Sequence, residues 1–327
     1  MAVKVAFLGV GSYAPEKVLR NADFEKMVDT SDEWITTRTG IKERRVSSNG
    51  QATSDLAALA ATRALEDAKV KAEDLDYVIT ATVTPDTPFP STSCYVQSKI
   101  NASNAACFDV GAACAGFIYG LSTAVAHVRQ NPKQKALLIG AETLSKITDY
   151  TDRTSCILFG DGAGAAIIGK SETDSDVLYT KLGSDGTRTD TMILPGGGSR
   201  CPATAETVAQ RMHYMKIRGR EVFKFAILKM RELMAEAREA CNLNPEDLAM
   251  VIPHQVNLRV IEPAISKLGI PIEKVAVNIQ KYGNTSAASI PLALDEAVKA
   301  GRVKRGDLVM LVAVGAGLVW GVSLVRW

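Results

Sequence analysis

Residues 106–129 read ACFDVGAACAGFIYGLSTAVAHVR, and this stretch decides the fold. An apolar strand over Ala106–Val110 leads through a turn of small residues into a long apolar helix at 115–129. The helix is almost without charge, and helices of that kind are usually buried on all sides. A helix buried all round needs a sheet against each face. The sequence therefore predicts five layers in the order helix, sheet, helix, sheet, helix.

Strands and helices alternate along the rest of the chain, which is typical of α/β proteins with mostly parallel sheets covered by helices. Strands are predicted at 3–10, 77–83, 106–110, 135–141, 163–169, 177–182, 248–253 and 275–278, with two more near the C-terminus, and helices at 54–68, 91–100, 115–129, 220–241, 256–268 and 286–300. The order is similar in the two parts of the chain, which predicts two similar halves, residues 1–172 and 173–327. Residues 185–207, rich in Gly, Thr, Ser and Pro, form the longest predicted loop and a candidate wall of a binding site.

Composition excludes several classes of protein. Of the 327 residues, 46% are hydrophobic and 23% are charged, close to the globular average of about 25%, so the chain can bury a large core. The net charge of +2 is too balanced for a typical nucleic-acid-binding protein. The six cysteines form no C-x-x-C pair and there are only three histidines, so no metal site is expected. Scattered free cysteines are typical of the reducing cytoplasm, where we expect the protein to reside.

One apolar segment permits a second interpretation. Residues 308–325 carry no charge over 18 positions, the lower limit for a membrane-spanning helix. The segment is rich in β-branched residues and contains the turn Gly315-Ala316-Gly317, which favours two buried strands instead. We therefore expect no membrane association.

Cys114 is the candidate nucleophile. It lies after a strand, at the N-terminus of the central helix, where the partial positive charge of a helix lowers the pKa of a thiol. The small residues around it leave space for a substrate to approach. Most free cysteines are buried structural residues, however, so the position alone does not decide between the two interpretations.

Two further polar residues occupy similar positions in the second half. His254 follows the apolar strand at 248–253, and the ends of strands are where open α/β folds hold their reactive groups. Asn284 lies in a tight turn before the second apolar helix, where an Asn can equally be a plain N-cap. The glycine turn at 315–317 exposes backbone N–H groups that could form an oxyanion hole. Together, Cys114, His254 and Asn284 indicate covalent catalysis.

The spacing of these three residues superficially matches a papain-like cysteine protease, with His 140 residues after Cys (254 − 114) and Asn 30 residues further on (284 − 254). The sequence around the nucleophile does not match, because that family has C-G-[SA]-C-[WY] where this chain has A-A-C-A-G-F. The alternation of strands and helices also indicates a different fold. The protease interpretation is therefore disfavoured.

The sequence closely resembles the β-ketoacyl-acyl-carrier-protein synthase III family, the initiating condensing enzymes of type II fatty-acid synthesis. The matching segments span most of the chain: TSDEWITTRTGIKERR (30–45), FPSTSC (89–94), GAACAGF (111–117), FGDGAGAA (159–166), GREVFK (219–224), PHQVNLR (253–259), GNTSAAS (283–289) and GAGLVWG (315–321). The resemblance implies a thiolase-like five-layer αβαβα fold, two similar halves and a homodimer.

The resemblance also implies a mechanism. Cys114 takes an acyl group from a short acyl-CoA, with acetyl-CoA the expected primer, while the backbone N–H groups of Cys114 and Ala316 hold the oxyanion. Malonyl-acyl-carrier protein (malonyl-ACP) then loses CO₂, and the enolate attacks the Cys114 thioester to form a 3-oxoacyl-ACP. His254 and Asn284 donate hydrogen bonds to the malonyl thioester carbonyl during this step. Acyl-CoA and malonyl-ACP are both substrates, and neither a cofactor nor a metal is implied.

Further matched positions imply contacts with the substrate. Trp34 and Arg153 match residues that sandwich the adenine of CoA, and stacking by Trp and Arg is physically reasonable. Thr30 and Arg38 lie in the same N-terminal segment as Trp34. Phe89 matches a position that reaches across the dimer and lines the acyl pocket, where a large ring implies a short primer.

Three basic residues, Lys224, Arg259 and Lys267, match a patch that docks the acidic carrier protein. Family members can carry another basic residue where this chain has Ser266, so the patch is expected to be weaker here. Two alternatives stay open on the sequence. One is a polyketide-priming or related acyltransferase with the same Cys-His-Asn set, and the other is a catalytically silent scaffold that binds carrier protein.

Overall fold

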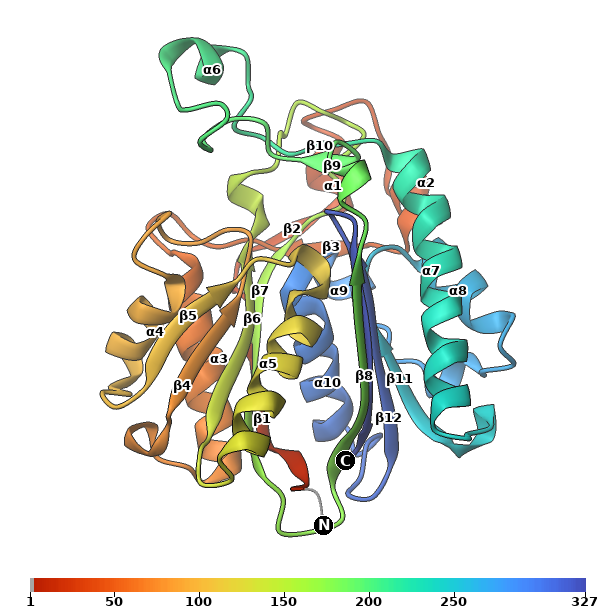
Figure 1. Ribbon diagram of the computed structural model, residues 1–327. Helices are drawn as coiled ribbons and strands as arrows, with labels where there is room; N and C mark the ends of the chain where they lie inside the picture. Colours follow the sequence, from red (N-terminus) through yellow and green to blue (C-terminus); the bar gives the residue numbers. More distant parts are fainter. Residues whose placement is uncertain (1–2) are drawn as a thin grey trace.

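The computed structural model describes residues 3–327 and contains two mixed β-sheets, with helices between them and on both outer faces (Figure 1). The first sheet comprises, in order across it, β1 (Val5–Tyr13), β7 (Asp161–Lys170), β6 (Ala136–Thr143), β4 (Tyr77–Ala81) and β5 (Ala106–Val110). The second comprises β11 (Leu248–Pro253), β12 (Leu308–Gly315), β13 (Val319–Arg326) and β8 (Asp176–Ser184).

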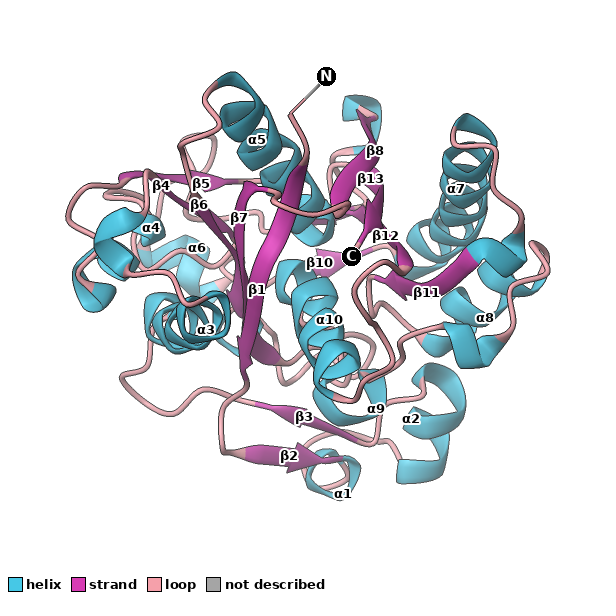
Figure 2. Ribbon diagram, turned by 90° about the horizontal axis from the view of Figure 1, so that it is seen from below, coloured by secondary structure: helices cyan, strands magenta, loops and turns pink. Residues whose placement is uncertain are grey.

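Three helical layers enclose these sheets. The outer face of the first sheet is covered by α3 (Thr53–Ala68) and α4 (Thr92–Ile100), and that of the second by α7 (Gly219–Ala240) and α8 (Leu258–Ser266). Between the sheets lie α5 (Gly116–Gln130) and α10 (Ser289–Lys299) (Figure 2). Their buried side chains share one apolar core with both sheets. The predicted layer order is confirmed. Its physical reason is that α5 and the first six residues of α10 have too little charge to face water on either side.

Shorter elements connect the layers. In the first half, β2 (Val18–Arg20) and β3 (Glu43–Arg45) pair as a small separate sheet, with α1 (Asn21–Phe24) and α2 (Asp32–Thr39) between them in the sequence. In the second half, β9 (Met192–Ile193) pairs with β10 (Lys216–Ile217), and the segment between them carries α6 (Ala205–Ala209), which projects from the body of the molecule (Figure 1). The short helix α9 (Ile279–Tyr282) precedes the turn that leads into α10. Short 3-10 turns occur at Ala72–Asp74, Ala113–Ala115, Leu144–Lys146, Gly186–Arg188, Pro245–Asp247, Ile272–Lys274 and Ser286–Ala288.

Both sheets are mixed, so the prediction of mostly parallel sheets is wrong. β4 runs parallel to β5 and β6, and β11 runs parallel to β12. β7 runs antiparallel to β1 and β6, and β13 runs antiparallel to β12 and β8. The connections explain the difference: parallel neighbours need a long crossover, usually a helix, whereas β12 and β13 are joined by a tight turn and no α-helix separates β6 from β7.

Two local predictions also need correction. The strand predicted at 275–278 does not form, and a single parallel bridge joins Val251 to Val275 there. The loop predicted at 185–207 contains the short strand β9 and the start of α6. The run at 275–278 and the two-residue strand β9 are too short for a sequence pattern to distinguish a strand from a loop.

The two sheets repeat one strand order. Reading β8-β13-β12-β11 beside β1-β7-β6-β4 gives each strand a counterpart, and the bridge at Val275 lies where β5 stands in the first sheet. Each half also contributes one central helix, α5 or α10, entered through a short 3-10 turn. The fold therefore consists of two similar halves. The boundary between residues 172 and 173 lies in the link from β7 to β8 and stays a prediction.

The uncharged segment 308–325 forms the antiparallel pair β12–β13. Val309 and Leu311 pack in the core of the central helices, whereas Met310 and Val312 pack in the core beneath α7, as the alternation of a strand requires. No helix within residues 3–327 is long and apolar enough to cross a membrane.

Candidate active site

The two central helices begin at the same place in the molecule. The turn Ala113–Ala115 before α5 packs against the turn Ser286–Ala288 before α10 and against β12. Ala113 and Ser286 have φ values of 41° and 47°, a left-handed conformation that residues other than glycine rarely adopt and that clusters at functional sites. Cys114 therefore belongs to one strained turn and packs beside a second, where the two buried helices begin.

Cys114 opens onto a cavity of about 220 Å³, which we call the inner cavity. Its lining is mostly apolar and comes from both halves of the chain. The lining residues are Val83, Ala113, Cys114, Leu144, Ile147, Phe159, Met192, Ile193, Leu194, Met215, Ser286 and Ala316. Apolar walls with a few polar groups are typical of a site for a small apolar ligand, such as a short acyl chain.

A second cavity of about 340 Å³, the outer cavity, adjoins the first. The two cavities share Phe159 and Met192 in their linings. Asn284 lines the outer cavity, as do Trp34 and Arg38 from α2. Together the cavities connect the surface at Trp34 with the buried thiol, which suits a long substrate whose reactive end is at one tip.

The backbone N–H groups of Cys114 and Ala316 lie close enough to the Cys114 sulfur to lower the pKa of the thiol. The close approach of the two turns depends on Gly315, because a Cβ there would lie 2.7 Å from the backbone nitrogen of Cys114. N–H groups that converge beside a nucleophile are the donors that an oxyanion needs. The structure thus brings together the two residues predicted to form the oxyanion hole.

Burial raises the pKa of the Cys114 thiol to about 12. The prediction of a lowered pKa is therefore wrong. The loss of water around the sulfur outweighs the interactions with Ser286 and with the two backbone N–H groups, which lower the pKa, and the nearby carboxyl of Glu142 raises it further. Cys114 is a neutral thiol at rest, so another group must take its proton when the sulfur attacks.

His254 follows β11 and is 1% exposed. Burial lowers the pKa of its ring to about 3, so the ring is neutral. Its Nδ1 lies 2.7 Å from Ser289 Oγ, and its Nε2 is buried without a hydrogen-bond partner. Ser289 Oγ also lies 2.8 Å from the carbonyl oxygen of Ser286, so its one proton can serve only one of these two acceptors. When Ser289 donates to Nδ1, the ring proton is on Nε2, which can then donate to a substrate.

Asn284 lies in the turn just before Ser286–Ala288 and is 4% exposed. Its backbone N–H donates to Leu158 O at 2.8 Å, and its Oδ1 accepts from the backbone N–H of Ser286 at 2.9 Å. The second contact orients the amide, because only the oxygen can accept a hydrogen bond. The NH₂ group therefore points away from the turn and, since Asn284 lines the outer cavity, is available to a substrate there.

Two guanidinium groups lie close to the indole ring of Trp34. Those of Arg38 and Arg153 are each 5.6 Å from the ring centroid. Arg153 is also paired with Asp29 at 3.0 Å, and the neighbouring Thr30 Oγ1 is buried without a hydrogen-bond partner. All four residues predicted to bind CoA are thus brought to one place, beside the outer cavity. An aromatic ring with guanidinium groups close to it suits a planar, negatively charged nucleotide.

The residues predicted to contact other chains are exposed. Phe89 is 86% exposed and is not part of the inner cavity of the single chain. Arg259 lines the outer cavity, whereas Lys224 on α7 and Lys267 at the C-terminal end of α8 lie on the surface nearby. Because α7 and α8 pack against each other, the three basic residues belong to the same side of the molecule.

Sequence reasoning missed two features of this site. One is Glu142, a fully buried carboxyl on β6 whose pKa is raised by burial to about 7. The sequence feature that could have revealed Glu142 is its position, because an acidic residue is rare in an otherwise apolar strand. The other is the segment from β9 to β10, whose Met192 and Met215 help to line the inner cavity. No sequence pattern connects these methionines with Cys114.

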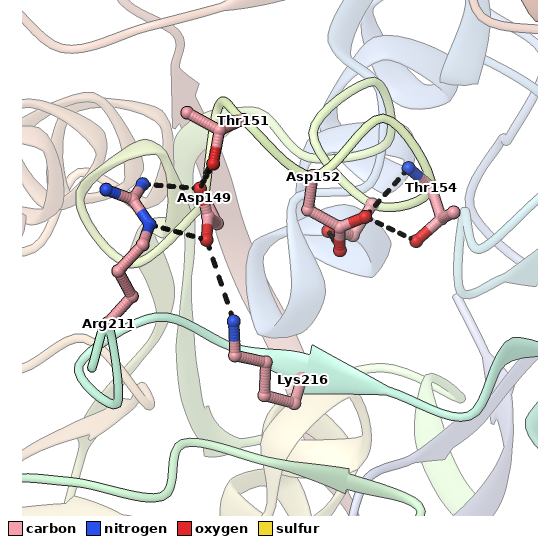
Figure 3. A network of polar contacts seen from close by, with 7 residues as sticks. Asp149, Thr151, Asp152, Thr154, Arg211 and Lys216 are labelled. Carbon is pink, nitrogen blue, oxygen red and sulfur yellow. Dashed lines mark hydrogen bonds and ion pairs between the residues drawn. The ribbon is translucent and has the colours of Figure 1, made fainter.

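An ion pair attaches this segment to the loop after β6. Arg211 contacts both carboxylate oxygens of Asp149, at 2.5 and 3.0 Å, and Lys216 lies 3.6 Å from the second oxygen (Figure 3). The hydrogen bonds from Arg211 hold the pKa of Asp149 well below its usual range. Since the same loop carries Arg153 and Thr154, the ion pair joins the wall of the inner cavity to the residues beside the outer one.

Two sequence-family models match the chain. Residues 108–186 match the model described as 3-oxoacyl-[acyl-carrier-protein (ACP)] synthase III, and residues 238–327 match the C-terminal model of the same name. The first match contains Cys114, and the second contains His254, Asn284 and Ala316. A β-ketoacyl-[acyl-carrier-protein] synthase III from Caldanaerobacter subterraneus subsp. tengcongensis is 55% identical to the chain, over 100% of this chain and 99% of its own length.

Solved structures show the same relationship. The 3-oxoacyl-[acyl-carrier-protein] synthase III of Aquifex aeolicus matches with a TM-score of 0.91 at 47% identity, covering 99% of this chain and 100% of its own. The priming β-ketosynthase of a polyketide pathway has the same TM-score of 0.91 at a lower identity of 33%, covering 99% of this chain and 96% of its own. The chain belongs to the β-ketoacyl-acyl-carrier-protein synthase III family, the thiolase-like acyltransferases that initiate fatty-acid synthesis by decarboxylative condensation.

Proposed function

We propose that this synthase uses acetyl-CoA as its primer and that Cys114 carries the acetyl group. The observation that carries the proposal is the position of the thiol, which faces an apolar cavity of about 220 Å³ and lies close to two backbone N–H groups. Malonyl-ACP is the second substrate that membership of the family implies. With an acetyl primer, the reaction converts acetyl-CoA and malonyl-ACP into acetoacetyl-ACP, CO₂ and CoA.

In the first step, the Cys114 sulfur attacks the acetyl carbonyl. The backbone N–H groups of Cys114 and Ala316 stabilise the oxyanion, and the bond from the acetyl carbon to the CoA sulfur then breaks. Loss of one such donor typically lowers a rate by about 100- to 1,000-fold. Gly315 supports this step because its missing side chain lets both donors reach the same point.

His254 and Asn284 act in the second step. In our proposal, His254 Nε2 and the Asn284 NH₂ group donate to the malonyl thioester carbonyl, which accepts the electron pair that CO₂ leaves behind. Both donors stay neutral near pH 7, since the buried ring of His254 has a pKa of about 3 and Asn does not titrate. This role requires Ser289 to donate its proton to Nδ1, 2.7 Å away, and not to the Ser286 carbonyl oxygen, 2.8 Å away, because only then is the ring proton on Nε2. The enolate then attacks the acetyl carbon, and the Cys114 sulfur leaves as a thiolate that takes up one proton from solvent, the proton that the overall reaction consumes.

Primer length depends on how much of the inner cavity is filled. In the single chain, a volume of about 220 Å³ is larger than an acetyl group needs. Phe89, which is 86% exposed, is the candidate to fill part of it, with the ring entering from a second copy of the chain. With the Phe89 ring in place, the smaller cavity favours acetyl over propionyl or branched primers. Each extra methylene changes the binding free energy in such a pocket by about 1–3 kcal/mol.

The homodimer is proposed at the free edge of β5. This strand ends the first sheet, so among residues 3–327 no further strand pairs with its outer side. Such an edge favours pairing with another chain. The segment that carries Phe89 is attached to β5, because the backbone N–H groups of Thr92 and Ser93 donate to Asp109 at 2.6 and 2.9 Å. Sedimentation velocity should therefore give a dimer, and a monomer at micromolar concentration would contradict this part of the proposal.

Carrier-protein docking is proposed on Lys224, Arg259 and Lys267. Charge reversal in a Lys224→Glu, Lys267→Glu double variant should raise KM for malonyl-ACP, and the difference from the parent should shrink as salt screens the charges. Acetylation by acetyl-CoA should be unchanged. Lys71→Glu, at an exposed lysine near the outer face of the first sheet, is the matched control and should behave as the parent. An equal loss in the control would remove the site-specific explanation.

Intact-protein mass spectrometry after mixing with acetyl-CoA, followed by peptide mapping, tests the primer and the nucleophile together. We expect one acetyl group, located on Cys114, and none in a Cys114→Ala variant. An adduct that forms only with a longer or branched acyl-CoA would refute the acetyl primer and retain the nucleophile. The absence of an adduct with any acyl-CoA would refute Cys114 as the acyl carrier.

A further inference from the structure

Glu142 is a fully buried carboxyl near the nucleophile that the mechanism above does not use. It accepts hydrogen bonds from Thr84 Oγ1 at 2.6 Å, from Thr82 Oγ1 at 3.1 Å and from the backbone N–H of Val83 at 3.1 Å. All of these partners are neutral, so none of them balances a negative charge. Burial raises the pKa of the Glu142 carboxyl to about 7, which means that both of its protonation states are accessible near neutral pH.

The fold directs this carboxyl toward the catalytic turns. Gly140 lies two residues before Glu142 on β6, and residues two apart on a strand face the same side of a sheet. A Cβ at Gly140 would collide with the carbonyl oxygen of Ala287, so this side of β6 packs directly on the turn Ser286–Ala288. The side chain of Glu142 therefore extends into the layer that holds this turn and Cys114.

Ser286 stands between the carboxyl and the thiol. Its hydroxyl lies close enough to the Glu142 carboxyl and the Cys114 thiol to lower the pKa of each group, and the residue lines the inner cavity beside the sulfur. The residue is 3% exposed, and its Oγ has no hydrogen-bond partner in the resting structure. A buried hydroxyl that has no hydrogen-bond partner and lies between two acidic groups can accept a proton from one of them while it donates its own proton to the other.

We propose that Ser286 and Glu142 form a relay that takes the Cys114 proton during acyl transfer, a role that rests on the proposed function of Cys114. The thiol proton passes to Ser286 Oγ while the Ser286 proton passes to the Glu142 carboxylate. At the same time the sulfur forms its bond to the acyl carbon. When the bond from that carbon to the CoA sulfur breaks, Glu142 returns its proton to Ser286 Oγ, which gives its own proton to the CoA sulfur, so that CoA leaves as the thiol. Protons and charge balance without a further reactant.

Charge explains why the proton transfer and the attack belong together. A free thiolate at Cys114 beside an ionised Glu142 would put two negative charges into one buried site, and the carboxyl accordingly raises the pKa of the thiol. Moving the proton to Glu142 as the sulfur attacks keeps a single negative charge throughout. A base whose pKa lies near the working pH is the most effective acceptor. His254 does not suit this task, because its pKa is about 3 and its Nδ1 contacts Ser289.

In this relay Glu142 is a positioning residue, because it accepts the proton only through Ser286 and does not itself contact the substrate. A purely structural interpretation is also available, in which Glu142 only fixes the loop at Val83. The pH dependence separates the two. The groups that interact with the carboxyl are Thr82, Val83, Thr84, Ser286 and Cys114, and of these only Cys114 titrates.

The test measures the single-turnover rate of Cys114 acetylation by acetyl-CoA as a function of pH. In the parent enzyme the rate should rise through a pH of about 7. In Glu142→Gln and in Ser286→Ala, the rate at neutral pH should fall on the order of 100-fold, and the rise near pH 7 should disappear. Thr84→Val removes the shortest hydrogen bond to the charged form of the carboxyl, so it should move the rise to higher pH and leave the rate above the rise close to that of the parent.

A structural role for Glu142 predicts slower acetylation with an unmoved pH dependence, and that result would overturn the relay. Parent-like rates and pH dependence in folded Glu142→Gln would also overturn it. If Glu142→Gln does not fold, the Thr84→Val profile decides: a rise displaced to higher pH supports the relay, and an undisplaced rise refutes it. A parent enzyme that accepts no acyl group refutes the proposed function instead, so the two failures are distinguishable.

Discussion

Replacing Gly315 with Ala tests whether the close approach of the β12 turn to the nucleophile is needed for acyl transfer. A Cβ at this position would lie 2.7 Å from the backbone nitrogen of Cys114, 3.2 Å from its Cβ and 3.3 Å from the nitrogen of Ala115. Ordinary contacts begin at 3.4 Å, so relief of the closest contact needs a displacement of about 0.7 Å (3.4 − 2.7). The closest of these atoms belongs to the backbone and cannot rotate away, so the whole turn must move.

The displacement affects the thiol and both oxyanion donors together. A misplacement of about 1 Å near reacting atoms can lower a rate by about 100-fold, so we expect acetylation of Cys114 in Gly315→Ala to slow by about 10- to 100-fold. Overpacking of this kind costs about 1–3 kcal/mol of stability, which should leave the enzyme folded. Decarboxylation of malonyl-ACP should change less, because His254 and Asn284 lie on other turns.

Rapid-quench mass spectrometry with acetyl-CoA measures the acetylation rate, and circular dichroism checks the fold. Gly186→Ala is the matched control: Gly186 follows Asp185, which exchanges backbone hydrogen bonds with Leu318 beside the same turn, and a Cβ there would meet no atom within 4 Å. The control should be acetylated at the parent rate. A Gly315→Ala enzyme that is acetylated as fast as the control would refute the reasoning.

Three further predictions concern the other residues of the site. His254→Ala and Asn284→Ala should each accept an acetyl group on the nucleophile yet release CO₂ from malonyl-ACP about 100- to 1,000-fold more slowly, and loss of acetylation in a folded variant would contradict the assigned roles. Ser289→Ala should slow CO₂ release more than acetylation; nitrogen NMR of the parent with isotope-labelled histidine should find the His254 proton on Nε2, and a proton on Nδ1 would exclude the donor role. Asp149→Asn should lower the free energy of unfolding by about 1–2 kcal/mol at pH 7, a modest value because Arg211 is partly exposed. Because the pKa of Asp149 is lower in the folded than in the unfolded protein, this stabilisation is complete above the unfolded pKa of about 3.9 and is lost as pH falls through the folded pKa. Urea unfolding at neutral pH and below pH 4 should therefore show a difference that shrinks in acid, and a constant difference would count against the ion pair.

The central helices show which part of the fold could be predicted from the sequence. The near absence of charge in α5 and in the first six residues of α10 is a local pattern, and it predicted their burial between two sheets correctly. Strand direction was predicted incorrectly at β7 and β13, because it depends on the path of each connection. The prediction of a strand at 275–278 was wrong for a related reason, because a short apolar run forms a strand only where a partner backbone lies alongside it.

The active site likewise has features that the sequence predicts and features that only the tertiary structure decides. By itself, the sequence determined the candidate residues, because Cys114, His254, Asn284 and Ala316 lie in local motifs and in turns between predicted elements. The protonation state of the thiol was decided only by the tertiary structure: the partial charge of a helix is local, but the desolvation that raises the pKa of Cys114 comes from residues of both halves. The proximity of Glu142 to Ser286, 144 residues apart (286 − 142), likewise exists only once β6 packs on the turn before α10. Electrostatics in a buried site depends on everything within a few ångströms, and chain order carries no record of those distances.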